Sequence, residues 1–188
     1  MLQTKILVDT NSYLRLANNI HPLLFQEFGK EKYCLYVLDE LDEEFNRNNR
    51  LKNKFHWVNE PEYKANRKRK LSVSKEEKQQ ITIVPDYIRD FASSKSLTIS
   101  IIDSLVLAYG YVLKVPVVTD DADMICVAKE YKINIFQTLE LLELMKRCGH
   151  IDMEKIKTIT AYWEYNGDRP KNFYKDFKRL FNQPPPKF

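Results

Sequence analysis

Carboxylate side chains follow aliphatic runs at three distant places in this sequence. Asp9, Glu40 and Asp121 each lie just after such a run, and Asp103 stands where a further helix is expected to begin. Carboxylate oxygens are the ligands that Mg²⁺ and Mn²⁺ prefer. A cation held by them can lower the pKa of a bound water and orient it against a phosphate. The four acids therefore indicate metal-assisted hydrolysis of a phosphodiester bond.

The aliphatic runs predict strands buried on both faces of a parallel sheet, because they show no amphipathic period. These strands are expected at residues 5–8, 33–38, 115–118 and 133–136. Helices are expected between them and after the last, at residues 13–17, 39–45, 100–109, 124–131 and 139–148, with Gly149 as the final stop. This alternation predicts an α/β domain with a central parallel sheet and covering helices.

The predicted sheet brings the acids together. In an open parallel sheet, sites form in the crevice at the carboxyl ends of the strands, and Asp9 and Asp121 both lie at that edge. Like charges a few ångströms apart repel by about 1 to 4 kcal/mol per pair, so such a cluster tends to bind a cation or take up protons. We therefore expect a Mg²⁺ or Mn²⁺ site there.

Each acid also has a purely structural interpretation. Asp9 could cap the next helix, Glu40 could complement a helix dipole, and Asp103 could close a capping box with Ser100. The acids at 120, 121 and 123 could form a turn. Independent caps have no reason to converge on one sheet edge, so their joint placement favours a site.

Four blocks, at residues 6–12, 37–41, 102–108 and 117–123, resemble in order the conserved blocks of PIN-domain nucleases. The match runs from residue 5 to about residue 148. The resemblance implies a three-layer α/β/α domain, dependence on Mg²⁺ or Mn²⁺, and endonucleolytic cutting of RNA. It also implies a toxin role in a bacterial toxin–antitoxin or phage-defence system, with a cognate antitoxin as partner. PIN-like proteins often dimerise, so a homodimer is a further expectation.

The resemblance also assigns roles to individual residues. The four acidic positions fall on Asp9, Glu40, Asp103 and Asp121, with Asp123 as an auxiliary metal ligand and Asn11 and Thr119 as polar supports. Asp39 competes with Glu40 for the second position. Glu40 is favoured because the family places its acid directly before an apolar residue of the helix.

The middle of the chain is polar and basic. Residues 46–74 are expected to form frayed helix and exposed loop, followed by a short helix from residue 75, a strand at 81–84 and a short helix at 87–92. A basic loop beside an acidic metal site could bind RNA phosphates, and the alternative is a solvated surface. The candidate phosphate-binding side chains are Lys64, Arg67, Lys68, Arg69 and Lys70.

The last part of the chain lies outside the family resemblance. We predict a PIN-like nuclease domain over residues 1–149 and a C-terminal helical extension with a proline-rich tail over 150–188. Its two helices are expected at 153–165 and 172–181, and their aromatic side chains could pack in a core, contact an antitoxin or stack on bases.

The composition of the chain limits which classes of protein these predictions can describe. A chain of 188 residues with 44% hydrophobic side chains suits one domain, and a net charge of +4 mildly favours an anionic partner. The three cysteines, at 34, 126 and 148, predict reduced core residues and not a disulfide framework. No membrane-spanning run or signal peptide is recognised, so a cytoplasmic protein is expected.

Three other functions compete with an RNA-cutting enzyme. A DNA-directed nuclease of the flap or 5′-nuclease kind would use the same metal chemistry. A phosphoryl-accepting domain would need a second acid beside Asp9, which the sequence lacks. A non-catalytic binding module would carry the acids as relics, and loss of metal binding on substitution of Asp9 would count against it.

Overall fold

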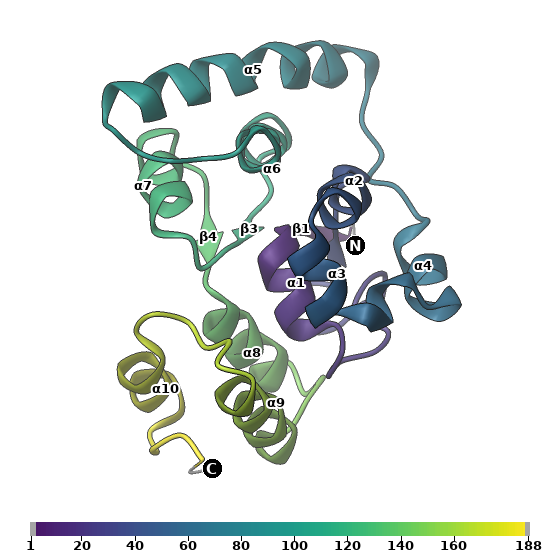
Figure 1. Ribbon diagram of the computed structural model, residues 1–188, viewed down its shortest axis with the longest axis vertical. Helices are drawn as coiled ribbons and strands as arrows, with labels where there is room; N and C mark the ends of the chain where they lie inside the picture. Colours follow the sequence, from purple (N-terminus) through teal and green to yellow (C-terminus); the bar gives the residue numbers. More distant parts are fainter. Residues whose placement is uncertain (1–2, 187–188) are drawn as a thin grey trace.

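The computed structural model describes residues 3–186 and contains a four-stranded parallel sheet near its centre (Figure 1). The strands are β1 (Thr4–Val8), β2 (Tyr33–Tyr36), β3 (Val117–Val118) and β4 (Ile135–Phe136), in the order β2-β1-β3-β4. The predicted parallel sheet is confirmed, although β3 and β4 have only two residues each. The chain order reverses between β1 and β3, which makes the gap between their carboxyl ends the topological switch point.

Helices cover both faces of this sheet, so the predicted three-layer α/β/α architecture is confirmed. Ile6 and Val8 of β1 join one core and Leu7 joins the other, as the alternation of side chains along a strand requires. The first face is covered by α1 (Thr10–Leu16) and α8 (Thr138–Arg147), and the second by α5 (Lys75–Ser94), α6 (Ile101–Leu113) and α7 (Ala122–Glu130) (Figure 1).

Helix α5 corrects the expectation of two short helices separated by a strand. Ser74 and Glu77 form a capping box at its start, and the helix continues through Pro85 to its end. Its buried residues recur at spacings of four, three and four, at Ile81, Pro85, Ile88 and Ala92. This helical spacing lays one apolar stripe against α6, whereas a strand at 81–84 would have turned alternate residues into solvent.

The polar segment 46–74 is also more ordered than expected. After α2 (Glu40–Arg47) it forms α3 (Asn49–Lys54), the 3₁₀ helix η1 (His56–Asn59) and α4 (Pro61–Arg67). Its few apolar side chains join the first core, because Trp57, Val58 and Tyr63 are all buried. The prediction of an exposed loop is therefore wrong for residues 49–67 and is confirmed for residues 68–74, which lie between α4 and α5.

The two C-terminal helices form where they are expected, as α9 (Met153–Tyr165) and α10 (Phe173–Phe181). Trp163, Phe173 and Phe177 are buried in the same core as β1 and α8. The cysteines are all free, but Cys126 is exposed, so its prediction as a core residue is wrong. None of the helices formed by residues 3–186 is long and apolar enough to cross a lipid bilayer.

Candidate active site

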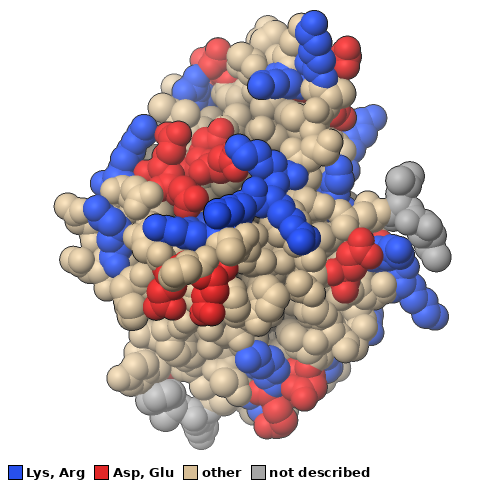
Figure 2. Space-filling view, turned by 90° about the vertical axis from the view of Figure 1, so that its right-hand side faces the viewer, with Lys and Arg blue, Asp and Glu red and all other residues tan. Residues whose placement is uncertain are grey.

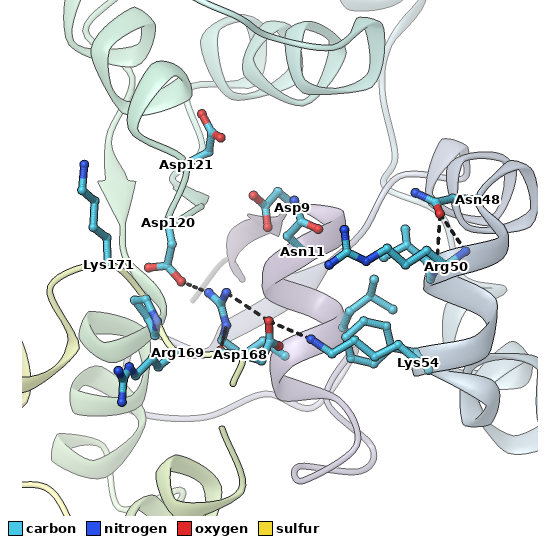
Figure 3. Close-up of a pocket in the computed structure, with 15 residues that line it drawn as sticks. Asp9, Asn11, Asn48, Arg50, Lys54, Asp120, Asp121, Asp168, Arg169 and Lys171 are labelled. Atoms are coloured by element: carbon cyan, nitrogen blue, oxygen red, sulfur yellow. Dashed lines mark hydrogen bonds and ion pairs between the residues drawn. The ribbon is translucent and has the colours of Figure 1, made fainter. Parts of the chain in front are cut away.

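A crevice of about 420 Å³ opens at the switch point between β1 and β3 (Figure 3). The acids that line it come from the ends of these two strands and from the loop between α9 and α10. They are Asp9, Asp120, Asp121 and Asp168. Asn11, one of the predicted polar supports, lies on α1 and also lines the crevice. The predicted meeting of Asp9 and Asp121, from the first and fourth acidic blocks, at the edge of the sheet is thus present.

Asp9 lies immediately after β1 and is only 3% exposed. Its Oδ1 accepts a hydrogen bond of 2.6 Å from the Ser12 backbone N–H, which makes it the N-cap of α1. Burial raises the pKa of Asp9 to about 6, against the opposing effect of hydrogen bonds from Ser12 and Thr119, and the Asp120 carboxylate raises it further. Near neutral pH, Asp9 is therefore a desolvated anion for which a cation would be a favourable partner.

Asp120 already has a cationic partner. The Arg15 guanidinium forms an ion pair with it, and the Thr138 backbone N–H donates to its Oδ1 at 3.0 Å. Arg15 also donates from Nε to the Asp168 carbonyl at 2.9 Å. Arg15, which the sequence interpretation missed, therefore joins α1 to both acidic loops.

Asp121 is exposed on the wall of the crevice and caps α7. Its Oδ1 accepts from the backbone N–H groups of Asp123 at 2.9 Å and Met124 at 2.8 Å. The fully buried Thr119 accepts from the Asp121 backbone N–H at 3.1 Å through its hydroxyl. Thr119 thus holds the turn that presents Asp121.

Asp103 and Asp123 do not line this crevice. Asp103 forms a reciprocal capping box with Ser100, accepting from its backbone N–H at 2.9 Å. Asp123 accepts from the Thr98 backbone N–H at 2.8 Å, which ties α7 to the loop before α6. Both carboxylates therefore stabilise the local structure, Asp103 at the start of α6 and Asp123 between α7 and the loop before α6.

The acids of α2 divide between two places. Glu40 lines a separate pocket of about 220 Å³ with Asp39, Lys70 and Tyr109. Glu44, one helical turn later, lies close enough to Asp103 for that carboxylate to raise its pKa, although burial is the larger cause and a hydrogen bond with Thr10 acts in the opposite direction.

Glu44 Oε2 is buried and has no hydrogen-bond partner among residues 3–186. In the sequence, Glu44 is one of several acids that could complement the helix dipole, and it is not among the predicted site residues. Its spacing of four from Glu40 was the signal, because it places both acids on one face of α2.

The carboxylates suit a divalent cation in chemistry, since all are hard oxygen donors. Asp9 is desolvated and Glu44 has an orphaned buried oxygen, so both would gain from a cation. They are arranged as two interacting pairs, Asp9 with Asp120 and Glu44 with Asp103. No three or more His, Cys, Asp or Glu side chains of the described chain are grouped closely enough to hold a metal ion. Binding would therefore require carboxylate side chains to rotate toward one another.

The predicted phosphate-binding segment needs correction at Arg67. This side chain is buried, with Nη2 pairing with Asp42 at 2.7 Å and donating to the Val58 carbonyl at 3.0 Å, while Nη1 donates to the Tyr13 hydroxyl at 3.1 Å. Arg67 is thus a structural residue that ties α4 to α1 and α2, and it is not available to RNA.

The other four basic residues of that segment are exposed: Lys64, Lys68, Arg69 and Lys70. Lys70 Nζ is already paired with Asp39 at 2.5 Å, and the Arg69 guanidinium lies over the Phe25 ring. Figure 2 views this side of the molecule, where basic side chains lie next to acidic ones and do not form an uninterrupted positive surface.

A second set of basic side chains lies on the crevice itself. Arg50 and Lys54 come from α3, and Arg169 and Lys171 come from the loop between α9 and α10 (Figure 3). None of these four residues is among the site residues predicted from the sequence. The α9–α10 loop lies outside the family resemblance, and only the folded chain places it beside β3.

Comparison with known proteins gives little similarity. No protein-family model matches the sequence, and no curated protein matches it. Among solved structures, the chain is similar to one in the crystal structure of FitAcB from Neisseria gonorrhoeae, with a TM-score of 0.46 and 17% sequence identity. This similarity covers 71% of the present chain and 98% of the other. A likeness at this level does not establish a family or a function.

Proposed function

We propose that this protein is a metal-dependent endoribonuclease that hydrolyses RNA phosphodiester bonds at the crevice between β1 and β3. The observation that carries the proposal is Asp9, a carboxylate with 3% exposure at the carboxyl end of a central strand. Its burial is costly for an anion, and it opens onto the crevice beside a second strand-end acid, Asp121. Stability alone gives no reason to place these charges together.

Asp9 and Asp121, which line the crevice, would hold the Mg²⁺ or Mn²⁺, and Asp103 and Glu44 would complete the ligand set by rotating toward them, with Asp123 as an auxiliary acid. When bound, the cation supplies a water of lowered pKa and neutralises charge on the leaving oxygen. Thr119 keeps the Asp121 turn in place through its hydroxyl, and Arg15 holds Asp120 through an ion pair. Glu40 remains the alternative to Glu44, because it begins the same helix.

RNA as the substrate rests on the resemblance of the four acidic blocks to PIN-domain nucleases. A DNA-directed enzyme with the same site and a non-catalytic binding module are the competing functions. Labelled single-stranded RNA and DNA of one sequence, incubated with Mn²⁺, Mg²⁺ or EDTA, would separate the three. We expect RNA to be cut with either cation and not with EDTA. Cutting of DNA alone would overturn RNA as the substrate. No cutting of either nucleic acid would favour the non-catalytic binding module.

Matched variants locate the cutting activity in this crevice. Asp121→Asn should abolish it, whereas Asp86→Asn, on the exposed face of α5, should leave it unchanged. Equal activity in the wild-type protein and in both variants would mean that the cutting comes from a contaminant.

An inhibitory protein partner is part of the proposal. An antitoxin would block the crevice or insert a cationic side chain, as Arg15 already does at Asp120. Expression of the chain alone in a bacterium should then arrest growth and degrade RNA, and the Asp9→Asn variant should not. Unimpaired growth with an active purified enzyme would contradict the toxin role and leave the nuclease activity standing.

A further inference from the structure

The crevice has two walls that come from opposite ends of the chain. One wall is α1 with α3, and the other is the loop of residues 166–172 between α9 and α10, with the acids between them (Figure 3). Both walls carry basic side chains at the crevice. The C-terminal helices therefore complete the site as well as the core.

The loop that forms the second wall is held firmly. Asp168 accepts from Arg15 through its carbonyl at 2.9 Å, and its carboxylate lies 3.3 Å from Lys54 Nζ and 3.7 Å from Arg15 Nη2. The buried Trp163 donates from Nε1 to the Arg15 carbonyl at 2.9 Å. These contacts attach the loop to α1 and so fix the distance between the two walls. Asp9 caps the same helix.

Two of the basic side chains on these walls form no ion pair or side-chain hydrogen bond within residues 3–186. Lys54 pairs with Asp168, and Arg169 pairs with Glu164 at 2.6 Å. Arg50 and Lys171 are exposed, and neither side chain has an ion pair or hydrogen bond with any residue from 3 to 186. Arg50 points into the crevice from α3, and Lys171 lies across from it, beyond Asp120 and Asp121 (Figure 3).

We propose that the crevice is a groove for one nucleic-acid strand, in which Arg50 and Lys171 hold backbone phosphates on either side of the acids. The inference rests on the proposed nuclease function and adds to it how the substrate is held. A strand crossing between the walls would place the phosphate between these two contacts over Asp9 and Asp121. Arg50 and Lys171 are positioning residues, because they bind phosphates that do not react.

The dimensions favour a single strand over a duplex. A volume of about 420 Å³ is that of a small-ligand site, which suits a single strand with unstacked bases better than a duplex. The exposed aromatic residue Tyr174 lies beside Arg169, with the Arg169 guanidinium 5.0 Å from its ring centroid, but its hydroxyl is engaged by Arg169 and Glu164. Tyr174 does not line the crevice, so the contacts proposed for the strand are those of Arg50 and Lys171 with the backbone phosphates.

Binding can be measured without cutting by fluorescence anisotropy of a labelled 12-nucleotide RNA, with full-length protein carrying Asp9→Asn. Each phosphate contact on a single strand contributes about 0.7 to the slope of log affinity against log salt, which is about fivefold in affinity near 0.1 M salt. Arg50→Ala and Lys171→Ala should each weaken binding about fivefold and lower the slope by about 0.7, and together they should weaken binding about 25-fold.

Controls come from the same elements. Lys52→Ala on α3 and Lys175→Ala on α10 remove the same charge from side chains that do not line the crevice, so affinity should change less than twofold. A duplex of the same sequence should bind at least tenfold more weakly than the strand. Thermal unfolding of each variant confirms that the fold is kept.

The outcomes separate this inference from the nuclease proposal. Binding that depends on Arg50 and Lys171 in a protein that cuts no RNA would support the groove and overturn the nuclease. Cutting by a protein whose RNA affinity falls no more with Arg50→Ala and Lys171→Ala than with the two controls would overturn the groove alone. Tighter binding of duplex than of single strand would also overturn it.

Discussion

At the residue scale, the carboxylates of the proposed site also cap helices. Asp9, Asp103 and Asp121 each accept at least one backbone N–H at a helix start. A carboxylate has two oxygens and about four lone pairs, so one cap bond leaves acceptor capacity for a cation. The structural and the catalytic interpretations of these residues are therefore compatible, and sequence alone cannot choose between them.

Asp9→Asn should stabilise the folded protein near neutral pH. The pKa of Asp9 is raised from 3.8 to about 6, so its adverse contribution is absent below about pH 3.8 and is complete above about pH 6. The shift of about two units corresponds to roughly 3 kcal/mol. Asn keeps the helix cap, so the free energy of unfolding should rise by about 1 to 3 kcal/mol at pH 7.5.

Urea unfolding at pH 7.5 and pH 4.5 measures this gain, which should shrink at the lower pH. Asp86→Asn, at an exposed position, serves as the control and should change stability little at either pH. A gain for Asp9→Asn that is equal at both values would show that burial does not penalise the Asp9 anion.

Glu44→Gln should reduce metal-dependent cutting far more than Glu40→Gln. Loss of an outer-shell partner of a metal site costs about 10- to 100-fold, so loss of a ligand should cost at least about 100-fold. Glu43→Gln, on the exposed side of α2, is the matched control. Single-turnover RNA cleavage by the three variants provides the measurement, and a larger loss for Glu40→Gln would return the second acidic position to Glu40.

The sequence predicts Asp9 and Asp121 correctly as residues of one strand-end crevice, because the end of a buried strand fixes where the next side chain stands. It does not predict the division between Glu40 and Glu44, because that depends on which elements pack beside successive turns of α2: Lys70 and Tyr109 lie beside Glu40, and Asp103 lies beside Glu44. It also fails at Arg67, whose burial depends on Asp42, Val58 and Tyr13 from three different elements.

At the scale of elements, α5 shows where local pattern and tertiary packing disagree. A β-branched run ended by proline, residues 81–85, favours a strand locally. Packing of the stripe that includes Ile88 and Ala92 against α6 outweighs this preference. Proline lacks an N–H, so the helix loses one backbone hydrogen bond there and still continues.

Arg67→Ala should destabilise the fold by about 2 to 3 kcal/mol, because it leaves the Val58 carbonyl and Tyr13 hydroxyl without their buried donor. Lys68→Ala, the exposed neighbour, should change stability by less than about 0.5 kcal/mol. Thermal or urea unfolding compares the two. Equal stability of both variants would contradict a structural role for Arg67.

At the scale of the whole molecule, the C-terminal helices are part of the proposed site. The sequence predicts α9 and α10 within a residue of their bounds, since both are amphipathic. It does not predict that their connecting loop faces β3, because no pattern in the chain specifies how α10 returns to α8. Residue 149 therefore marks the end of the part of the chain that resembles PIN-domain nucleases. It does not mark the end of the hydrophobic core, which includes residues on both sides of it.

A chain ending at residue 149 should fail to fold stably. It would expose the face of α8 that packs on α10 and would remove Trp163, Phe173 and Phe177 from the core. Burial of one such side chain contributes about 1.5 to 3 kcal/mol, so losing several approaches the whole stability of a domain. Circular dichroism melting tests this, and a cooperative transition near that of the full chain would show that residues 150–188 are dispensable.

The measurement that tests the account most directly is the rate of Mn²⁺-dependent cleavage of a single-stranded RNA by the wild-type protein and by Asp9→Asn, purified in the same way. We predict that Asp9→Asn lowers the rate by at least about 100-fold, while its fold is as stable as that of the wild type or more so. Equal rates in the two proteins, with both folded, would contradict the claim that the crevice between β1 and β3 carries out the chemistry.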